Sequence, residues 1–278
     1  MKMTIGRDDL AQAAGQAVPT LERVVVQPVH KASRGFVNAA EVDVCELAVV
    51  TLLQAVGHAK PVLLLPITTL VRHQHQTLVT RGDLTLADVE GCTVGVRSWS
   101  QTTGVWVRGF LSEQYGVDLR KADWTVYEGS HVDGYQDPEY VRRAPEGSRL
   151  PTDFLEGRIE FGIMGNELPD APGIRTVIPD AAKVAEEWSR ETGFTPVNHV
   201  LAMTEAAARE HSAEILAAYD AMSAADADFA GFESLRPAVS KAGQYALDQD
   251  VLPRAVSYDE LVDRSCAALG VAPSRLGG

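Results

Sequence analysis

The sequence predicts an α/β protein with two lobes and a ligand cleft between them. Short apolar strands alternate with helices, which is typical of mainly parallel sheets covered by helices. These strands form two groups, and the C-terminal helices that follow have no strands of their own. We therefore expect a discontinuous first lobe of residues 1–80 and 200–278 and a second lobe of residues 86–195. The crossings are expected near 78–86 and 196–203, with a ligand at strand ends and helix starts.

The charge of the chain narrows the choice of partners. Its 278 residues carry a formal net charge of −13, and no cluster of Lys and Arg interrupts the sequence. A nucleic acid or an anionic membrane surface is therefore not an expected partner. A small anionic ligand is compatible with this charge, because a few local donors can outweigh a distant field.

The N-terminus turns polar at once, and no run reaches the roughly 18 apolar residues of a membrane span. The cysteines Cys45, Cys92 and Cys266 are far apart and have neither metal nor redox spacing. We therefore expect a cytoplasmic protein without a metal or a cofactor. The oligomeric state stays open, and a homodimer is one option.

The first lobe is expected to start with a short strand at residues 3–5 and a buried strand at residues 21–29, which are apolar and β-branched. Glu46 then stands between the end of a strand and an apolar helix at residues 48–56. Such a carboxylate is usually a cap or a salt-bridge partner. A role in a pocket is the alternative.

A strand at residues 61–66 leads to a polar segment that contains two histidines. His73 and His75 share one face if this segment is extended, a spacing that suits a metal ion. No cysteine or clear carboxylate cluster accompanies them, so we expect no metal. One histidine should point into the cleft, and the other should be solvated.

The second lobe centres on residues 95–117. A strand at 92–96 runs into a loop of hydroxyl and amide side chains at 98–103, and an amphipathic helix follows. The free N–H groups of a helix start, with the positive end of its dipole, form a ready site for a carboxylate or phosphate. The alternative is that Ser100, Thr102 or Thr103 merely caps the helix.

The long polar segment at residues 128–149 is expected to be a lid over the ligand. His131 within it is interpreted as a solvated loop histidine. His199 enters an apolar strand near the second crossing, where a core role and a catalytic role are both open. The remaining chain is helical, and Ser257 with Glu260 forms a capping box that starts a helix ended by Gly270.

Three separated segments resemble 4,5-dihydroxyphthalate decarboxylases. They are residues 43–47 (DVCEL), 95–117 (GVRSWSQTTGVWVRGFLSEQYGV) and 192–200 (TGFTPVNHV). The resemblance covers roughly residues 40 to 225 and implies the two-lobed type II periplasmic-binding-protein-like fold, used as a cytosolic enzyme. The same fold carries chorismate dehydratase and naphthoate-forming enzymes, so the fold alone does not fix the reaction.

The chain departs from that family around residues 66–81. Pro66 and His75 match the family pattern, but Val71 and Gln74 stand where the family has arginines. Arg72 replaces one of them by a shift of one residue. A pocket that lacks a guanidinium group at either of these positions would bind a dicarboxylate less well, since Arg is the bidentate partner of a carboxylate.

We therefore expect a cofactor-independent lyase, similar to a decarboxylase, that acts on a small hydroxylated aromatic or cyclic carboxylate. His75 and His199 are the candidate proton donors because histidine titrates near neutral pH, and Glu46 would orient one of them. Trp99 would stack on the ring. The carboxylate would be held by Arg72, Ser100, Gln101, Thr102 and Thr103. The alternatives are another reaction on the same fold, such as a dehydratase or hydrolase, and a non-catalytic cytosolic protein that binds a small anion.

Overall fold

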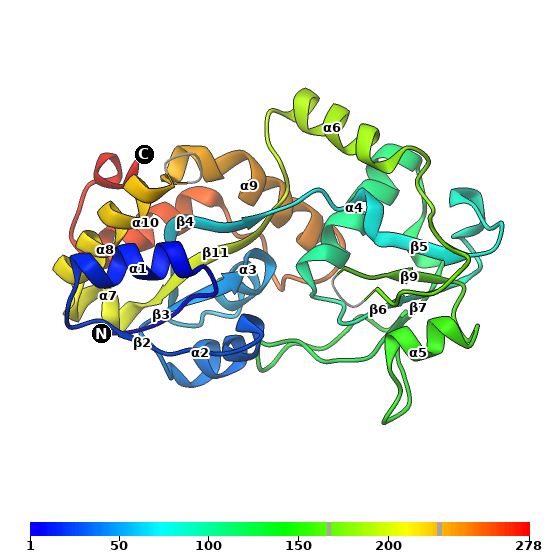
Figure 1. The fold of residues 1–278 in the computed structure, drawn as a ribbon, viewed down its shortest axis with the longest axis horizontal. Helices are drawn as coiled ribbons and strands as arrows, with labels where there is room; N and C mark the ends of the chain where they lie inside the picture. The colour runs from blue at the N-terminus through cyan, green and yellow to red at the C-terminus, as the bar shows by residue number, and fades with distance from the viewer. Residues whose placement is uncertain (166–167, 227–229) are drawn as a thin grey trace.

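The chain folds into two α/β lobes, each built around its own β-sheet (Figure 1). The computed structural model describes residues 1–165, 168–226 and 230–278. The two-lobed architecture predicted from the sequence is confirmed. Within the described ranges, no helix is both long and apolar enough to cross a membrane.

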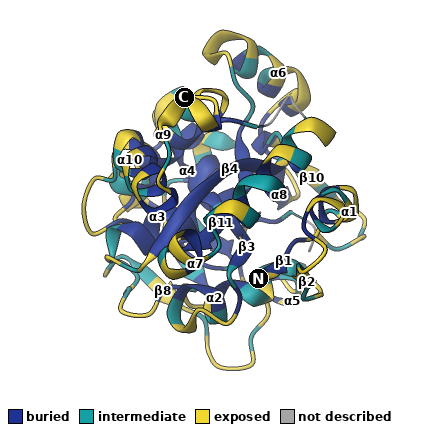
Figure 2. Cartoon of the chain, turned by 90° about the vertical axis from the view of Figure 1, so that its left-hand side faces the viewer, coloured by how far each residue is buried: buried dark blue, intermediate teal, exposed yellow. Residues whose placement is uncertain are grey.

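The sheet of lobe 1 has the strand order β2-β1-β3-β11-β4. β1 runs parallel to β2 and β3, whereas β11 is antiparallel to both of its neighbours. Figure 2 shows β4 and β11 as buried strands surrounded by helices. The strands are β1 (Lys2–Thr4), β2 (Glu22–Arg23), β3 (Val44–Ala48), β4 (Val62–Val71) and β11 (Val197–Thr204).

The sheet of lobe 2 has the order β10-β5-β9-β6-β7-β8. β9, β6, β7 and β8 run parallel, so their carboxyl ends meet at one edge, and β5 is antiparallel to β9 and β10. The strands are β5 (Leu78–Arg81), β6 (Thr93–Val96), β7 (Asp123–Val126), β8 (Val141–Arg143), β9 (Phe161–Ile163) and β10 (Ile174–Thr176).

Helices cover both sheets. In lobe 1, the last helix shows how local sequence sets the boundaries. The Ser257 hydroxyl accepts the Glu260 N–H at the start of the helix, and Gly270 ends the helix with a positive φ of 70°, so both boundaries lie where the sequence predicts them. The helices are α1 (Asp8–Ala17), α2 (Ser33–Ala39), α3 (Val49–Gly57), α4 (Thr102–Tyr115), α5 (Leu150–Leu155), α6 (Ala181–Thr192), α7 (Glu205–Glu210), α8 (Ser212–Ala225), α9 (Phe232–Asp248) and α10 (Tyr258–Leu269).

The first crossing between the lobes lies earlier than expected. β4 extends to Val71 because it pairs along its length with β11, and β5 already belongs to lobe 2. The chain therefore crosses at residues 72–77 rather than near 78–86, and lobe 2 begins at residue 78. The return follows α6 and reaches lobe 1 again with β11.

The expected strand at residues 21–29 is wrong in its length. Only Glu22–Arg23 pairs with β1, and the chain then turns through Pro28 into a 3₁₀ turn, η1 (Val29–Ala32). Proline lacks the N–H that a ladder needs, so it favours the departure from the sheet. This turn carries His30 to the edge of lobe 1 that faces lobe 2.

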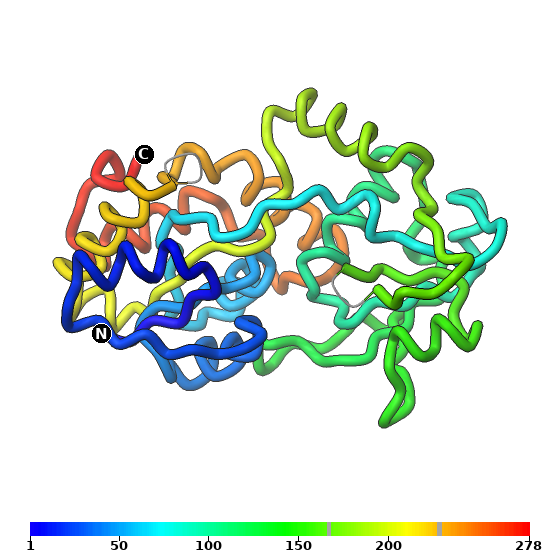
Figure 3. The backbone as a smooth tube through the Cα atoms, in the orientation of Figure 1, coloured from blue at the N-terminus to red at the C-terminus, as the bar shows by residue number. Residues whose placement is uncertain are grey.

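Two further segments tie the lobes together. The segment expected as a lid is held against α2, because the Asn38 side chain donates to His131 O at 2.8 Å and accepts from Asp133 N–H at 3.1 Å. α9 reaches α4, and the Tyr245 hydroxyl donates to Glu113 at 3.0 Å. The backbone tube in Figure 3 shows this end of α9 extending from lobe 1 to the junction.

Candidate functional site

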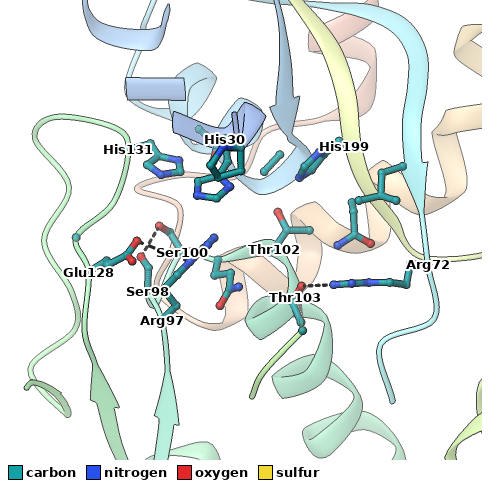
Figure 4. Close-up of a pocket in the computed structure, with 18 residues that line it drawn as sticks. His30, Arg72, Arg97, Ser98, Ser100, Thr102, Thr103, Glu128, His131 and His199 are labelled. Carbon is teal, nitrogen blue, oxygen red and sulfur yellow. Dashed lines mark hydrogen bonds and ion pairs between the residues drawn. The ribbon is translucent and has the colours of Figure 1, made fainter. Parts of the chain in front are cut away.

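A cavity of about 370 Å³ lies between the lobes and is lined by residues of both (Figure 4). This volume suits a small molecule. Its lining consists of Pro28, His30, Ala48, Thr51, Leu70, Arg72, Arg97, Ser98, Ser100, Gln101, Thr102, Thr103, Glu128, Gly129, His131, Gly165, Asn198 and His199.

Glu46 and His199 form a hydrogen-bonded pair at this cavity. They sit on the adjacent strands β3 and β11, and His199 Nδ1 lies 2.7 Å from Glu46 Oε1. The other carboxylate oxygen of Glu46 accepts the backbone N–H of Gly6 at 2.8 Å. Burial alone would raise the pKa of Glu46, but these hydrogen bonds and the nearby imidazole outweigh it and lower that pKa. An ionised Glu46 accepts the Nδ1 proton, which leaves Nε2 of His199 for the cavity it lines.

The start of α4 forms one wall of the cavity. Gln101 is the N-cap in extended conformation, and its side chain makes no cap hydrogen bond to the first turn. Thr102 Oγ1 instead accepts the backbone N–H of Val50 at 3.2 Å, so its hydroxyl connects the two lobes. The simple capping interpretation of this loop is therefore wrong. The N-terminal turn of α4 is available to an anion in the cavity.

Arg72 lies in the first crossing and reaches the same wall. Its Nη2 donates to Thr103 Oγ1 at 3.4 Å, and its guanidinium lines the cavity. Gly165 gives it room, because a Cβ at that position would lie 2.9 Å from Arg72 Nη2. The structure thus brings Arg72, Ser100, Gln101, Thr102 and Thr103 together around one space.

His75 is not brought into this cavity, which corrects the expectation that it faces the cleft. Its side chain is fully buried and stacks on Phe110 with 4.0 Å between ring centroids. Its Nε2 lies 3.2 Å from the Gln114 side chain. Burial lowers the pKa of His75 to about 4, so the ring is neutral at pH 7. We therefore assign His75 to the packing of the crossing segment against α4.

Trp99 is also absent from the cavity lining, which corrects its expected role in stacking on a substrate ring. It is fully buried, and its Nε1 donates to the backbone oxygen of Gln249 at 2.8 Å. The guanidinium of Arg108 lies 3.6 Å from the centroid of its ring. Arg108 also bonds the Gln249 side chain at 2.8 Å through Nε. Trp99 thus supports the polar loop from behind.

Four ionisable residues at the other side of the cavity were missed as site residues. His30 and His131 come from different lobes and stack with ring centroids 6.5 Å apart. Arg97 follows β6 directly, and its Nε lies 3.7 Å from Glu128 Oε2. Burial and the charge of Arg97 lower the pKa of His131 to about 4. The position of Arg97 at a strand end was a usable signal, whereas nothing local marks His30 or His131.

A metal site has no support in the arrangement of side chains. Among the residues that the structure describes, no group of three or more His, Cys, Asp or Glu is placed to hold a metal ion. His73, the neighbour considered with His75, instead lies 3.1 Å from the Ser189 hydroxyl through Nε2.

Comparison with known proteins agrees with the resemblance seen in the sequence. The chain is 26% identical over 196 residues to a curated 4,5-dihydroxyphthalate decarboxylase of Comamonas testosteroni, covering 63% of this chain and 57% of that protein. A protein of the same name from Pseudomonas putida is 24% identical over 173 residues, covering 56% and 66% respectively. The matched regions thus span less than two thirds of each relative. No protein-family model matches the chain.

A solved structure supports the fold independently. The periplasmic aliphatic sulphonate binding protein SsuA from Escherichia coli superposes with a TM-score of 0.53 over 99% of this chain and 80% of that protein. The two sequences are 10% identical, so this likeness concerns the fold alone. The expected resemblance to 4,5-dihydroxyphthalate decarboxylases and the periplasmic-binding-protein-like fold are both confirmed.

Proposed function

We propose that this protein is a lyase of the decarboxylase type that acts on a small hydroxylated aromatic or cyclic carboxylate in the interlobe cavity. The observation that carries the proposal is the hydrogen bond between Glu46 and His199, because His199 lines the same cavity as the start of α4. The similarity to proteins named 4,5-dihydroxyphthalate decarboxylase supports this reaction type.

His199 is the residue to which we assign the proton transfer. Its protonated imidazole donates the Nε2 proton to the ring carbon that carries the carboxylate, and the carbon–carbon bond to that carboxylate then breaks. Carbon dioxide leaves, and the proton takes its place on the ring. A substrate hydroxyl supplies electron density to the carbon as it is protonated. Glu46 fixes the imidazole tautomer and stabilises the positive charge of the protonated ring, as an acidic partner does for a catalytic histidine.

The wall opposite this pair holds the substrate in place. Arg72 and Thr103 offer N–H and O–H donors, and the first turn of α4 offers backbone N–H groups. Ser100, Thr102 and Thr103 on this wall are buried, so a charged contact made beside them is screened less than it would be in water.

A proton NMR time course with 4,5-dihydroxyphthalate and purified protein tests the reaction. We expect new aromatic signals from 3,4-dihydroxybenzoate. His199→Gln should reduce turnover about 100-fold or more, the usual scale for general acid catalysis, while ligand affinity changes little. His73→Gln is the matched control, because His73 does not line the cavity. Normal turnover by His199→Gln would refute the assignment.

A second candidate function is the binding of a small anion without turnover. The fold shared with a sulphonate-binding protein and the donors at the start of α4 favour it. In that case the ligand signals broaden in the NMR experiment, and no product signals appear over the whole time course.

A further inference from the structure

The charged side chains that line the cavity are mainly cationic, whereas the molecule as a whole is acidic. The chain holds 25 Lys and Arg against 38 Asp and Glu, yet the described residues that line the cavity include Arg72 and Arg97 and a single carboxylate, that of Glu128. Three histidines complete the ionisable lining. An acidic protein that gathers cationic donors around one space is suited to an anionic ligand.

The two arginines belong to different parts of this space. In Figure 4, Arg72 and Thr103 lie on one side, and His131 and Glu128 lie on the other. Arg97 extends from the end of β6, next to Ser98 and on the side of His131, whereas His199 lies on the side of Arg72. One substrate carboxylate at Arg72 and the start of α4 occupies only the first side, and the Arg97 side is left for another group of the ligand.

Arg97 is held loosely by its acidic neighbour. The 3.7 Å between Arg97 Nε and Glu128 Oε2 is an ion-pair distance that exceeds a hydrogen bond, and more than half of the Glu128 side chain is exposed. Because the pair is long and its Glu128 partner is exposed, it contributes little energy, and a ligand carboxylate can replace Glu128 as the partner of the less exposed Arg97. His30 and His131 stand at the same end and add ring nitrogens from both lobes.

We propose that Arg97, His30 and His131 form a second anion-binding end of the cavity. The ligand then carries acidic groups on opposite sides, one held by Arg97 and the other by Arg72 and the start of α4. The word phthalate in the relatives' name denotes two adjacent carboxylates. In this chain, the placement of Arg72 and Arg97 on opposite sides favours a diacid whose groups point apart over one with adjacent groups, which binds less tightly. The inference rests on the proposed function only where it treats this ligand as the substrate.

Calorimetric titration with three simple probes tests the proposal. Terephthalate has opposed carboxylates, phthalate has adjacent ones, and benzoate has one. We expect terephthalate to bind roughly tenfold or more tightly than the other two, since one added charge-assisted contact has this effect. Equal affinities for terephthalate and phthalate, or no measurable binding of terephthalate, would overturn the proposal.

Variants locate the effect at Arg97. Arg97→Gln should weaken terephthalate binding to the level of benzoate and leave benzoate within about threefold, because the Arg72 end remains. The terephthalate affinity of Arg97→Lys should lie between those of Arg97→Gln and the unmodified chain, since lysine keeps the charge but lacks the planar guanidinium group. Glu128→Gln should strengthen terephthalate binding by removing the competing carboxylate. An equal loss of benzoate and terephthalate affinity in Arg97→Gln would contradict a second end.

The test of the second anion-binding end can succeed or fail independently of the test of the proposed reaction. Terephthalate binding requires no turnover, so calorimetry measures it independently of the reaction, and His73→Gln should bind it as well as the unmodified chain does. Opposed-diacid preference without any turnover of hydroxylated carboxylates would refute the lyase and leave the second anion end standing. Turnover of a hydroxylated carboxylate without a preference for terephthalate would support the lyase and refute the second anion-binding end.

Discussion

His199 Nδ1 lies 2.7 Å from Glu46 Oε1, although 153 positions separate the two residues along the chain. The contact exists because β11 returns from lobe 2 and inserts beside β3. An ionised carboxylate behind an imidazole that lines a cavity is suited to proton transfer at the far ring nitrogen.

Glu46→Gln should lower kcat by about 100-fold while KM changes little, because the amide cannot stabilise a positively charged imidazole. Steady-state rates measured by NMR or by release of carbon dioxide check this. Glu41→Gln changes an exposed carboxylate of the same lobe and serves as the control. An unchanged kcat in Glu46→Gln would mean that the carboxylate has only a structural role.

Arg72→Lys should weaken benzoate binding by roughly tenfold, because an ammonium group cannot reproduce the planar fork of a guanidinium. Titration calorimetry measures the effect. Arg81→Lys, on the exposed end of β5, should bind benzoate like the unmodified chain. If both variants bind alike, Arg72 does not hold the ligand.

His75 should make the protein less stable in acid. Its folded-state pKa of about 4 lies below the ordinary value of 6.5, so the unfolded chain binds the proton first as the pH falls. The free energy of unfolding should therefore decrease between pH 6.5 and pH 4, by up to about 3 kcal/mol from this residue. Urea unfolding at several pH values should show a flatter slope for His75→Gln. His73→Gln should keep the slope of the unmodified chain, and an unchanged slope in His75→Gln would exclude His75 as its source.

Trp99→Phe should reduce stability by about 1–3 kcal/mol, because the buried backbone oxygen of Gln249 loses its donor. Benzoate affinity should change less than threefold, since Trp99 does not line the cavity. Urea unfolding and calorimetry on the same variant separate the two effects. A tenfold loss of affinity at unchanged stability would restore a direct role in ligand stacking.

Local patterns predicted the architecture well. Alternating apolar strands and helices indicated two α/β lobes, and the strand, polar loop and helix at residues 92–117 appear as β6 and α4. The polar loop itself faces the cavity because parallel strands present their carboxyl ends at one edge. Glu46 and His199 were each recognised as unusual polar residues beside apolar strands.

The local sequence could not predict which side chains are buried, because burial depends on contacts with residues far away in the chain. His75 and Trp99 have the chemistry of site residues, but their burial is decided by Phe110, Gln114 and Gln249. His30 and His131 meet only because α2 holds the segment after β7. The first crossing was misplaced because the length of β4 is set by β11, more than a hundred residues later.

The placement of β11 between β3 and β4 also governs the order in which the molecule can assemble. All strands of the lobe 2 sheet come from one continuous stretch, residues 78–176, whereas the lobe 1 sheet lacks its inner strand until residues 197–204 have been synthesised. During synthesis on the ribosome, the strands of lobe 2 are therefore all available before those of lobe 1. Until β11 is synthesised, β4 lacks the strand with which it pairs. The growing chain passes through a stage in which the start of α4 has been synthesised but His199 has not.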